Sequence, residues 1–326
     1  MKAIQIKEFG GPEVLQLVDI PEPLPAAQEV RVIVHAAGVN PNEAYARTGT
    51  YGAYIPELPY TPGFDGAGVI DVVGDGVTKY QPGDRVYIAG FMAKRNTGTY
   101  AEKVVVDVAS VHPLTDELTF EQGASLGIPG LAAYQAIVLR AQVKESDTVL
   151  LHGGSGAVGL TAIQIAKAIG AKVIATSSTE EGRKLIKALG ADEALDHIQN
   201  KNDQAILSAT NGQGPDVIIE MLANQNLETD MEIANKGARL VILGSRGTIQ
   251  IDPRHTMTKG LAILGMSAIN LDAAETATAY DALTKLVNEG EIFPLVGDVL
   301  PLEQAMLAHE QILTKKGNGK LVLKLK

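Results

Sequence analysis

The run from Val149 to Gly159, VLLHGGSGAVG, constrains the fold more than any other stretch of this sequence. A short apolar strand pattern is followed by a glycine turn and then by the start of a helical pattern. Gly154, Gly156 and Gly159 match Gly-x-Gly-x-x-Gly, which allows a tight turn, close backbone approach to a pyrophosphate, and packing of helix on strand. The run therefore predicts a dinucleotide site, with the pyrophosphate on free N–H groups at the helix N-terminus.

The segments after this motif supply the context that it needs. Apolar residues recur at helical spacing from Val158 to Ile169, and Gly170 stops the predicted helix. Residues 172–176 are apolar and β-branched, which completes a strand–helix–strand unit.

The first part of the chain, residues 1 to about 122, has the pattern of a small β-barrel. Short β-branched stretches alternate there with glycine and proline turns. Strands are expected at residues 30–34, 68–73, 84–88 and 101–106. The alternating stretch at 320–325 matches this part better than the middle of the chain, so residues 270–326 are assigned to the same domain.

Residues 123–269 have a different pattern, in which strands alternate with helices. Six strands are expected, at residues 148–151, 172–176, 193–196, 216–220, 239–243 and 262–265. This alternation predicts a doubly wound parallel sheet of the Rossmann type. The predicted fold class is α/β, with a barrel domain (1–122 and 270–326) and a Rossmann domain (123–269). A further helix is expected at about 273–288.

Composition excludes several classes of protein and of site. No apolar run reaches the ~18 residues of a membrane helix, and residues 1–7 alternate like a strand and do not resemble a signal peptide, so a cytoplasmic location is expected. The sequence has no cysteine, which excludes disulfides, thiolate nucleophiles and cysteine-based zinc or iron–sulfur sites. The formal net charge of −10 argues against a nucleic acid as a partner.

The end of the second Rossmann strand, Thr-Ser-Ser-Thr, bears on the choice of coenzyme. NAD sites usually carry an acidic residue there to hold the ribose 2′-hydroxyl. The hydroxyls of Ser177 and Ser178 leave room for a 2′-phosphate, and Arg183 and Lys184 follow closely enough to neutralise it. NADPH is therefore favoured over NADH.

Two other interpretations of these residues remain. Glu180 or Glu181 could hold the ribose, although the Ser-x-x-Glu pattern from Ser178 to Glu181 is typical of a helix capping box. Arg183 and Lys184 could belong to a solvated helix face.

Further motifs resemble the medium-chain dehydrogenase/reductase superfamily. The segments GVNPNEAYARTGTY (38–51) and PYTPGFDGAG (59–68) carry the resemblance. In the zinc alcohol dehydrogenases of that superfamily, a cysteine stands near position 40 and Gly-His-Glu near 63–65, where this chain has Asn40 and Gly-Phe-Asp. Both zinc sites of that branch are therefore missing, and no metal is expected.

Within the superfamily, the chain resembles the zinc-free quinone oxidoreductase (zeta-crystallin) subfamily. The similar runs are FGGPEVL (9–15), VNP (39–41), TGTY (48–51), YTPG (60–63), EMLAN (220–224), GSRGTI (244–249) and DPR (252–254). The resemblance implies a GroES-like barrel domain beside the Rossmann domain, and reduction of a quinone by NADPH without metal or flavin. It suggests one-electron transfer, but the residues leave plain hydride transfer open.

The same resemblance implies that Asn40, Tyr45 and Tyr51 line the cleft beside the nicotinamide. A tyrosine with the ordinary pKa near 10 stays protonated at neutral pH, so it can donate a hydrogen bond to a quinone oxygen that gains negative charge. Both tyrosines could instead be half-buried aromatics of a turn. Asp65 is expected to be structural, accepting backbone N–H groups in a turn. Ala132 replaces a threonine that relatives place near the nicotinamide, and it offers no donor there.

The resemblance also implies contacts with the coenzyme. The pyrophosphate would be held by Gly154, Ser155, Gly156, Ala157, Val158 and Gly159. Gly244 and Ser245 would lie beside the nicotinamide ribose, with Asn224 close by. His197 would lie near the adenosine end, and Lys315 or the lysine after it could reach the 2′-phosphate, although such histidines and lysines are more often solvated surface residues.

Two other functions fit the same features. Reduction of an enone or alkenal double bond would need the same cleft and the same hydrogen-bond donor. An NADPH-binding crystallin-like or AU-rich RNA-binding protein is also implied by the resemblance, and the negative charge disfavours the RNA partner. The strand at 262–266 would form an apolar edge of the Rossmann sheet, which predicts a homodimer or homotetramer joined there.

Overall fold

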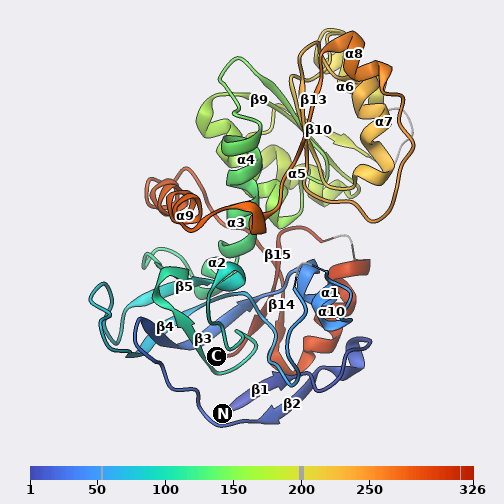
Figure 1. The fold of residues 1–326 in the computed structure, drawn as a ribbon. Helices are drawn as coiled ribbons and strands as arrows, with labels where there is room; N and C mark the ends of the chain where they lie inside the picture. Colours follow the sequence, from blue (N-terminus) through green and yellow to red (C-terminus); the bar gives the residue numbers. More distant parts are fainter. Residues whose placement is uncertain (53, 198–201, 316) are drawn as a thin grey trace. The chain divides into compact units, whose positions relative to one another are not determined.

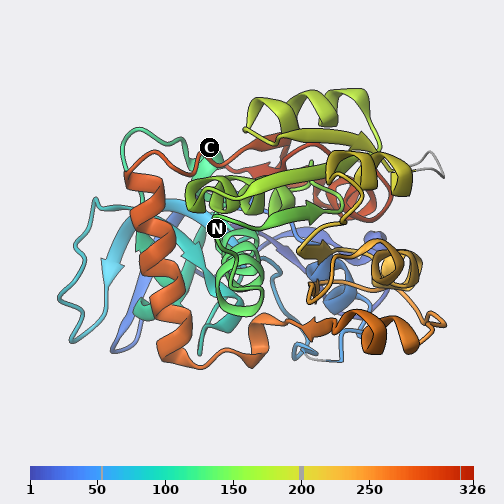
Figure 2. The same cartoon turned by 90° about the horizontal axis from the view of Figure 1, so that it is seen from above.

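The computed structural model describes residues 1–52, 54–197, 202–315 and 317–326. The chain forms two compact units (Figure 1, Figure 2). The first unit consists of residues 1–129 and 294–326, and the second of residues 130–293.

The boundaries of the units differ from those predicted at 122/123 and 269/270. Helix α9 (Ala273–Asn288) belongs to the second unit, because Leu283 packs against Gly130 at the start of that unit. The Gln164 side chain also accepts a hydrogen bond from the Phe293 N–H (2.7 Å) and donates one to the Phe293 carbonyl (3.2 Å). The helical pattern predicted the helix itself, but such a pattern does not say which unit the helix packs against.

The first unit is built on a seven-stranded sheet in the order β14-β15-β3-β4-β5-β7, with β6 also paired to β3. Its strands are β3 (Glu29–Gly38), β4 (Asp65–Val73), β5 (Arg85–Ala89), β6 (Lys103–Asp107), β7 (Val111–Pro113), β14 (Val296–Pro301) and β15 (Lys320–Lys324). The four strands predicted for the barrel are therefore confirmed. Strand β15 pairs antiparallel with β3, which confirms that the 320–325 segment belongs with them.

Successive side chains of β3 alternate between the buried core of this unit and a less buried face. Val30, Val32 and Val34 are fully buried, whereas Arg31 and Ile33 between them are only half-buried. Outside the sheet, this unit contains the hairpin β1 (Lys2–Gln5) and β2 (Gln16–Asp19) and the helices α1 (Pro41–Arg47), α2 (Phe120–Gly123) and α10 (Ala305–Thr314).

The second unit is a six-stranded parallel sheet in the order β10-β9-β8-β11-β12-β13. Its strands are β8 (Thr148–Leu151), β9 (Lys172–Ser177), β10 (Glu193–Asp196), β11 (Val217–Glu220), β12 (Arg239–Ile242) and β13 (Ala262–Gly265), so all six predicted strands are confirmed. The chain order reverses between β8 and β11. In such sheets, ligands bind at the carboxyl ends of the strands beside this reversal.

Helices connect the parallel strands of this unit. They are α4 (Ala157–Ile169), α5 (Glu180–Ala188), α6 (Asn202–Ala209), α7 (Ala223–Ile233) and α8 (Arg254–Lys259), with α3 (Gly127–Tyr134) leading into the unit. Helix α4 ends as predicted at Gly170, whose φ of +95° is left-handed. Among the described residues, no helix is long and apolar enough to cross a membrane.

Candidate functional site

The predicted dinucleotide turn lies between β8 and α4, at the carboxyl edge of the parallel sheet. Its left-handed residue is Gly153 (φ +62°), which precedes the predicted triplet. A Cβ on Gly154 would lie 2.9 Å from the Cβ of Ala175, and one on Gly159 would lie 2.7 Å from the Gly153 carbonyl oxygen. Glycine at these two positions lets the turn pack closely on β9 and lets α4 pack closely on the turn.

The remaining glycine of the triplet has a different environment. A Cβ on Gly156 would meet only the Gly153 carbonyl oxygen, at 3.6 Å. Gly156 is also the N-cap of α4 and offers no side chain to the first helical N–H groups, those of Ala157 and Val158. The neighbouring Ser155 hydroxyl lies 2.9 Å from that of Ser177 and joins the turn to β9. These features fit a pyrophosphate at the N-terminus of α4.

The residues predicted for the 2′-phosphate divide into two groups. Arg183 donates hydrogen bonds to the Ser177 carbonyl (3.2 Å) and to Asp196 (3.0 Å), which fixes its guanidinium at the carboxyl ends of β9 and β10. Ser177 is buried and Ser178 is half-buried. Lys184 instead forms an exposed i,i+4 ion pair with Glu180. The structure therefore brings Arg183, but not Lys184, into contact with Ser177.

The capping box predicted from Ser178 to Glu181 is wrong, because α5 begins one residue later and its N3 residue, Gly182, has no side chain. The N-cap of α5 is Thr179, whose hydroxyl accepts the Gly182 N–H at 3.0 Å. Glu180 and Glu181 therefore lie in the first helical turn, where carboxylates interact favourably with the helix dipole.

Two further residues predicted near the coenzyme lie at the surface. The exposed His197 follows β10, and its Nδ1 is 3.5 Å from the Thr176 hydroxyl. Lys315 lies in the first unit, where its ammonium pairs with Asp298. The alternative, Lys316, lies outside the described residues.

The residues predicted beside the nicotinamide ribose lie together at the ends of β11 and β12. The Asn224 side-chain oxygen accepts the Arg246 N–H (2.8 Å) and the Ser245 hydroxyl (3.4 Å). A Cβ on Gly244 would lie 2.6 Å from the Met221 carbonyl oxygen, so only glycine fits this approach. Ala132 lies half-buried on α3.

A buried cluster behind this edge was missed in the sequence. The Nε2 of His152 lies 2.8 Å from Asp230 and 3.7 Å from Glu220. Burial alone would lower the pKa of His152, but the two carboxylates outweigh it and raise that pKa to about 9. Burial raises the pKa of Glu220 to about 7. His152 follows β8 and Glu220 ends β11, so the adjacent strand ends could have indicated this contact.

The first unit contains a second buried centre, formed by Asn40, Asp65 and Lys320. The Asn40 amide donates to Asp65 (2.9 Å), and the Lys320 ammonium donates to both Asp65 (3.0 Å) and the Asn40 side-chain oxygen. All three side chains are nearly inaccessible to solvent. Asp65 also accepts the Ile128 N–H (2.9 Å), which is the structural role expected of it, although it lies in β4 and not in a turn.

Glu43 extends this centre further into the core. Its carboxylate accepts the N–H groups of Asn40 and Phe64 (both 2.9 Å) and the Tyr100 hydroxyl (2.8 Å). The Tyr100 hydroxyl lies 3.2 Å from Nε2 of His309. Burial raises the pKa of Glu43 and lowers that of His309 to about 3. Asn40 and Glu43 form a capping box at the start of α1, a local signal in the sequence that was missed. Tyr100 and His309 are far from Glu43 along the chain, and the sequence did not indicate them.

The three residues predicted to be catalytic lie on or beside α1. Asn40 is the N-cap of this helix and is buried, whereas Tyr45 and Tyr51 are half-buried. Burial raises the pKa of Tyr51, which also interacts with the Asn42 side chain. No hydrogen bond joins either tyrosine hydroxyl to Asn40 within the described part of the chain.

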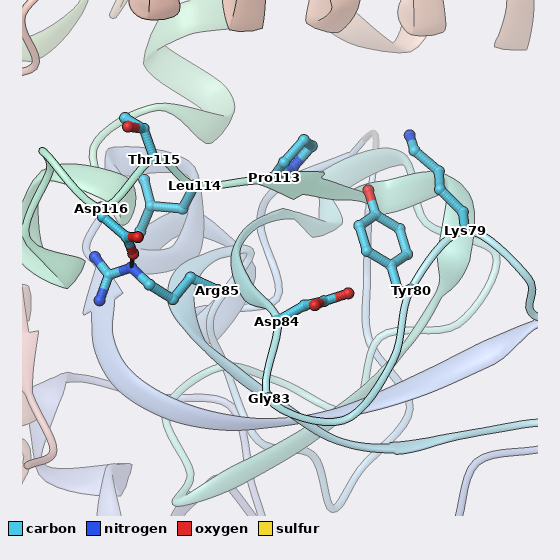
Figure 3. A pocket seen from close by; sticks show the side chains of 9 residues that line it. All are labelled: Lys79, Tyr80, Gly83, Asp84, Arg85, Pro113, Leu114, Thr115 and Asp116. Atoms are coloured by element: carbon cyan, nitrogen blue, oxygen red, sulfur yellow. Dashed lines mark ion pairs between the residues drawn. The ribbon is translucent and has the colours of Figure 1, made fainter.

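Two cavities open in the first unit. A wide one of about 620 Å³ is shown in Figure 3, where Arg85 pairs with Asp116 (3.1 Å) on one side and Lys79 stands beside Tyr80 on the other. The second cavity, of about 290 Å³, lies beside Glu43 and Phe64. None of the residues predicted from the sequence to form the site lines either cavity.

The chain is similar to known oxidoreductases in both sequence and structure. Two family models match: the alcohol dehydrogenase GroES-like domain at residues 26–116 and zinc-binding dehydrogenase at 157–286. Human quinone oxidoreductase is 43% identical over 327 residues, which cover 100% of this chain and 98% of the human protein. Among solved structures, Escherichia coli quinone oxidoreductase in complex with NADPH has a TM-score of 0.87 at 28% identity, with 100% of both chains covered. An NAD-dependent alcohol dehydrogenase has a TM-score of 0.91 at 32% identity, again over 100% of both chains.

Proposed function

Because this chain belongs to the quinone oxidoreductase family of the medium-chain dehydrogenase/reductase superfamily, we propose that it oxidises NADPH and reduces a quinone without a metal ion. When bound, NADPH supplies the electrons. The residues of this chain bind the coenzyme, orient the acceptor and donate hydrogen bonds to the oxygen that gains charge.

The observation that carries this proposal is the Lys320 ammonium between Asn40 and Asp65. These two residues stand where the resemblance puts a zinc-binding cysteine and the glutamate of Gly-His-Glu. A lysine ammonium already supplies positive charge to their oxygens, and Phe64 at the histidine position has no ligand atom. The family model named for zinc binding covers residues 157–286, which include neither position.

The choice of NADPH is supported by the surroundings of Ser177. The Arg183 guanidinium is held there by Asp196, and no carboxylate ends β9 where NAD sites usually carry one. The similar Escherichia coli enzyme was solved with NADPH, whereas another similar structure is described as NAD-dependent. We propose that Ser177, Ser178 and Arg183 bind the 2′-phosphate, and that Asn224, Gly244 and Ser245 bind the nicotinamide ribose.

Steady-state kinetics with purified protein test the proposal. NADPH should be oxidised with an ortho-quinone, more slowly with an enone of similar size, and at least tenfold less efficiently when NADH replaces it. Activity should survive a chelator and gain nothing from zinc. Faster turnover of the enone would favour the double-bond reductase, and activity that is lost to the chelator and restored by zinc would contradict the metal-free proposal.

We further propose a homo-oligomer joined through β13, the last strand of the parallel sheet. Ile263 on this strand is partly exposed, and β13 pairs with β12 on one side only in the described sheet. Arg140 covers the edge at one end by donating to the Gly265 carbonyl. Sedimentation at micromolar concentration should give a dimer or tetramer, and a monomer would refute this arrangement.

A further inference from the structure

The narrower cavity of the first unit lies next to the buried centre at Asn40. It has a volume of about 290 Å³, near the small end of the range for small-molecule sites. Its walls come from α1, from the segment between α1 and β4, and from the segment between β5 and β6. Glu43 forms part of the wall and accepts the backbone N–H of Asn40, so a single hydrogen bond separates the cavity from a residue proposed to be catalytic.

Three aromatic rings form an apolar wall of this cavity. The ring centroids of Tyr54 and Phe64 are 5.4 Å apart at an interplanar angle of 75°. Those of Phe64 and Phe91 are 5.1 Å apart at 83°. Each pair packs edge to face and fixes the orientation of Phe64. A cavity of this volume lined by aromatic rings fits a flat aromatic molecule of one or two fused rings.

The polar groups of the wall leave a hydrogen-bond donor available, whereas the main acceptor is already occupied. The Glu43 carboxylate already accepts hydrogen bonds from two backbone N–H groups and from the Tyr100 hydroxyl. The Tyr60 hydroxyl is buried and has no hydrogen-bond partner among the described residues. Burial raises the pKa of Tyr60, so this hydroxyl keeps its proton. A carbonyl oxygen in the cavity would give it an acceptor.

Two adjacent cations, Lys94 and Arg95, stand at the same cavity. Arg95 is paired with Glu29. Within the described ranges, the Lys94 ammonium forms no ion pair or side-chain hydrogen bond, and Lys94 is exposed. In a chain with a net charge of −10, an exposed cation beside an aromatic cavity favours an anionic ligand.

We propose that this cavity binds the part of the acceptor that carries its substituents, and that the preferred acceptors are aromatic quinones with an anionic substituent, held between the aromatic wall and Lys94. This inference rests on the proposed function, because it takes the quinone as the occupant. It adds a substrate class and four residues, Tyr54, Phe64, Phe91 and Lys94, none of which belongs to the predicted catalytic set.

Binding without turnover tests the cavity separately from catalysis. Naphthalene-2-sulfonate and neutral 2-naphthol are titrated into the coenzyme-free protein by calorimetry. The sulfonate should bind more tightly. Lys94→Gln should weaken binding of the sulfonate about threefold and leave binding of 2-naphthol unchanged, and Phe91→Ala should weaken binding of both.

Lys79→Gln is the matched control, since it removes an exposed lysine from the wide cavity and changes the net charge equally. Absence of saturable binding, or equal effects of the two lysine changes, would overturn the proposal.

Kinetics then connect the cavity with the acceptor. In Lys94→Gln, the anionic substrate 1,2-naphthoquinone-4-sulfonate should show a KM raised about threefold, while the neutral parent 1,2-naphthoquinone should keep its wild-type value. Naphthalene-2-sulfonate should compete with the quinone. Inhibition that is not competitive would show that the cavity is not the acceptor site. Binding of the sulfonate with no turnover of either quinone would instead contradict the proposed function and leave the cavity as a ligand site.

Discussion

Lys320 is the cation of a nearly solvent-free centre in the first unit. Its ammonium is the positive partner of Asp65, and it also holds the side-chain oxygen of Asn40. Removing one member of such a pair leaves the other charge buried without compensation. The lysine therefore matters more for stability than an exposed lysine on the same strand does.

Lys320→Met should lower the free energy of unfolding by about 3–5 kcal/mol, because Asp65 keeps a buried charge. Urea denaturation measures this loss. Lys324→Met is the control on β15, since Lys324 is exposed and pairs with Glu121 at 3.4 Å, and it should cost less than about 1 kcal/mol. Equal losses of unfolding free energy in the two variants would show that the buried pair stabilises the protein no more than the exposed pair does.

Tyr45→Phe tests the proposed donor to the quinone. The change removes a hydroxyl from a half-buried residue of α1 and keeps the ring. We expect kcat to fall several-fold while the Kd of NADPH stays constant, because the hydroxyl would act on the acceptor alone. Tyr80→Phe removes a hydroxyl that donates to the Val111 carbonyl (2.6 Å) at the wide cavity, and should leave kcat unchanged. Unchanged kinetics in Tyr45→Phe would remove this residue from the mechanism.

At the level of residues, the sequence identified groups that lie in local motifs and missed those joined over long separations. Ser177 ends a strand, and Gly159 and Asn224 lie shortly after strands, all in recognisable patterns. Lys320 meets Asn40 and Asp65 only when β15 pairs with β3, and nothing in the sequence near Lys320 signals that contact.

The elements around the glycine turn are held by close contacts that can be tested one at a time. Gly159→Ala should cost about 1–3 kcal/mol of stability, because its Cβ would press on backbone atoms 2.7 Å away. Gly156→Ala should fold normally, since its φ of −76° suits alanine, but should weaken NADPH binding about tenfold by covering the phosphate approach. Thermal unfolding and coenzyme titration separate the two effects. A Gly156→Ala protein with wild-type NADPH affinity would argue against a pyrophosphate at this turn.

The cluster of His152, Glu220 and Asp230 joins β8, β11 and α7, and its titration should make the second unit sensitive to alkali. His152 has a folded-state pKa of about 9 against an ordinary 6.5. Its protonation therefore adds fully to the free energy of unfolding below pH 6.5, and this stabilisation is lost as the pH rises through 9. Glu220, with a pKa of about 7 against 4.5, acts in the same direction at lower pH. The melting temperature should fall by several degrees between pH 7 and 9.5. In His152→Gln this dependence should be smaller, and an equal slope in both proteins would contradict the assignment.

At the level of elements, periodicity located all six strands of the second unit and the limits of α4. It did not locate the N-cap of α5, because Ser178 and Thr179 are both good capping residues and only the backbone decides between them. The unit to which α9 belongs depends on tertiary packing against Gly130, which the helix pattern does not contain.

For the whole molecule, the distribution of buried histidines predicts that acid destabilises the first unit before the second. His112 and His309 both lie in the first unit, and burial lowers the pKa of each to about 3. Their stabilising effect is complete above the ordinary value of 6.5 and is lost as the pH falls towards 3. Hydrogen exchange at pH 5, corrected for intrinsic rates and compared with pH 7, should show greater loss of protection in residues 1–129 than in 130–293. Equal loss in both units would contradict this prediction.

The pairing of β15 with β3 has a consequence for biosynthesis. Residues 130–293 leave the ribosome as a complete unit and can fold while Lys320 is still unmade. Until then, the nascent first unit exposes the edge of β3 at residues 36–38 and lacks the counter-ion of Asp65. We expect the middle of this polypeptide to become protease-resistant during translation before its first third does.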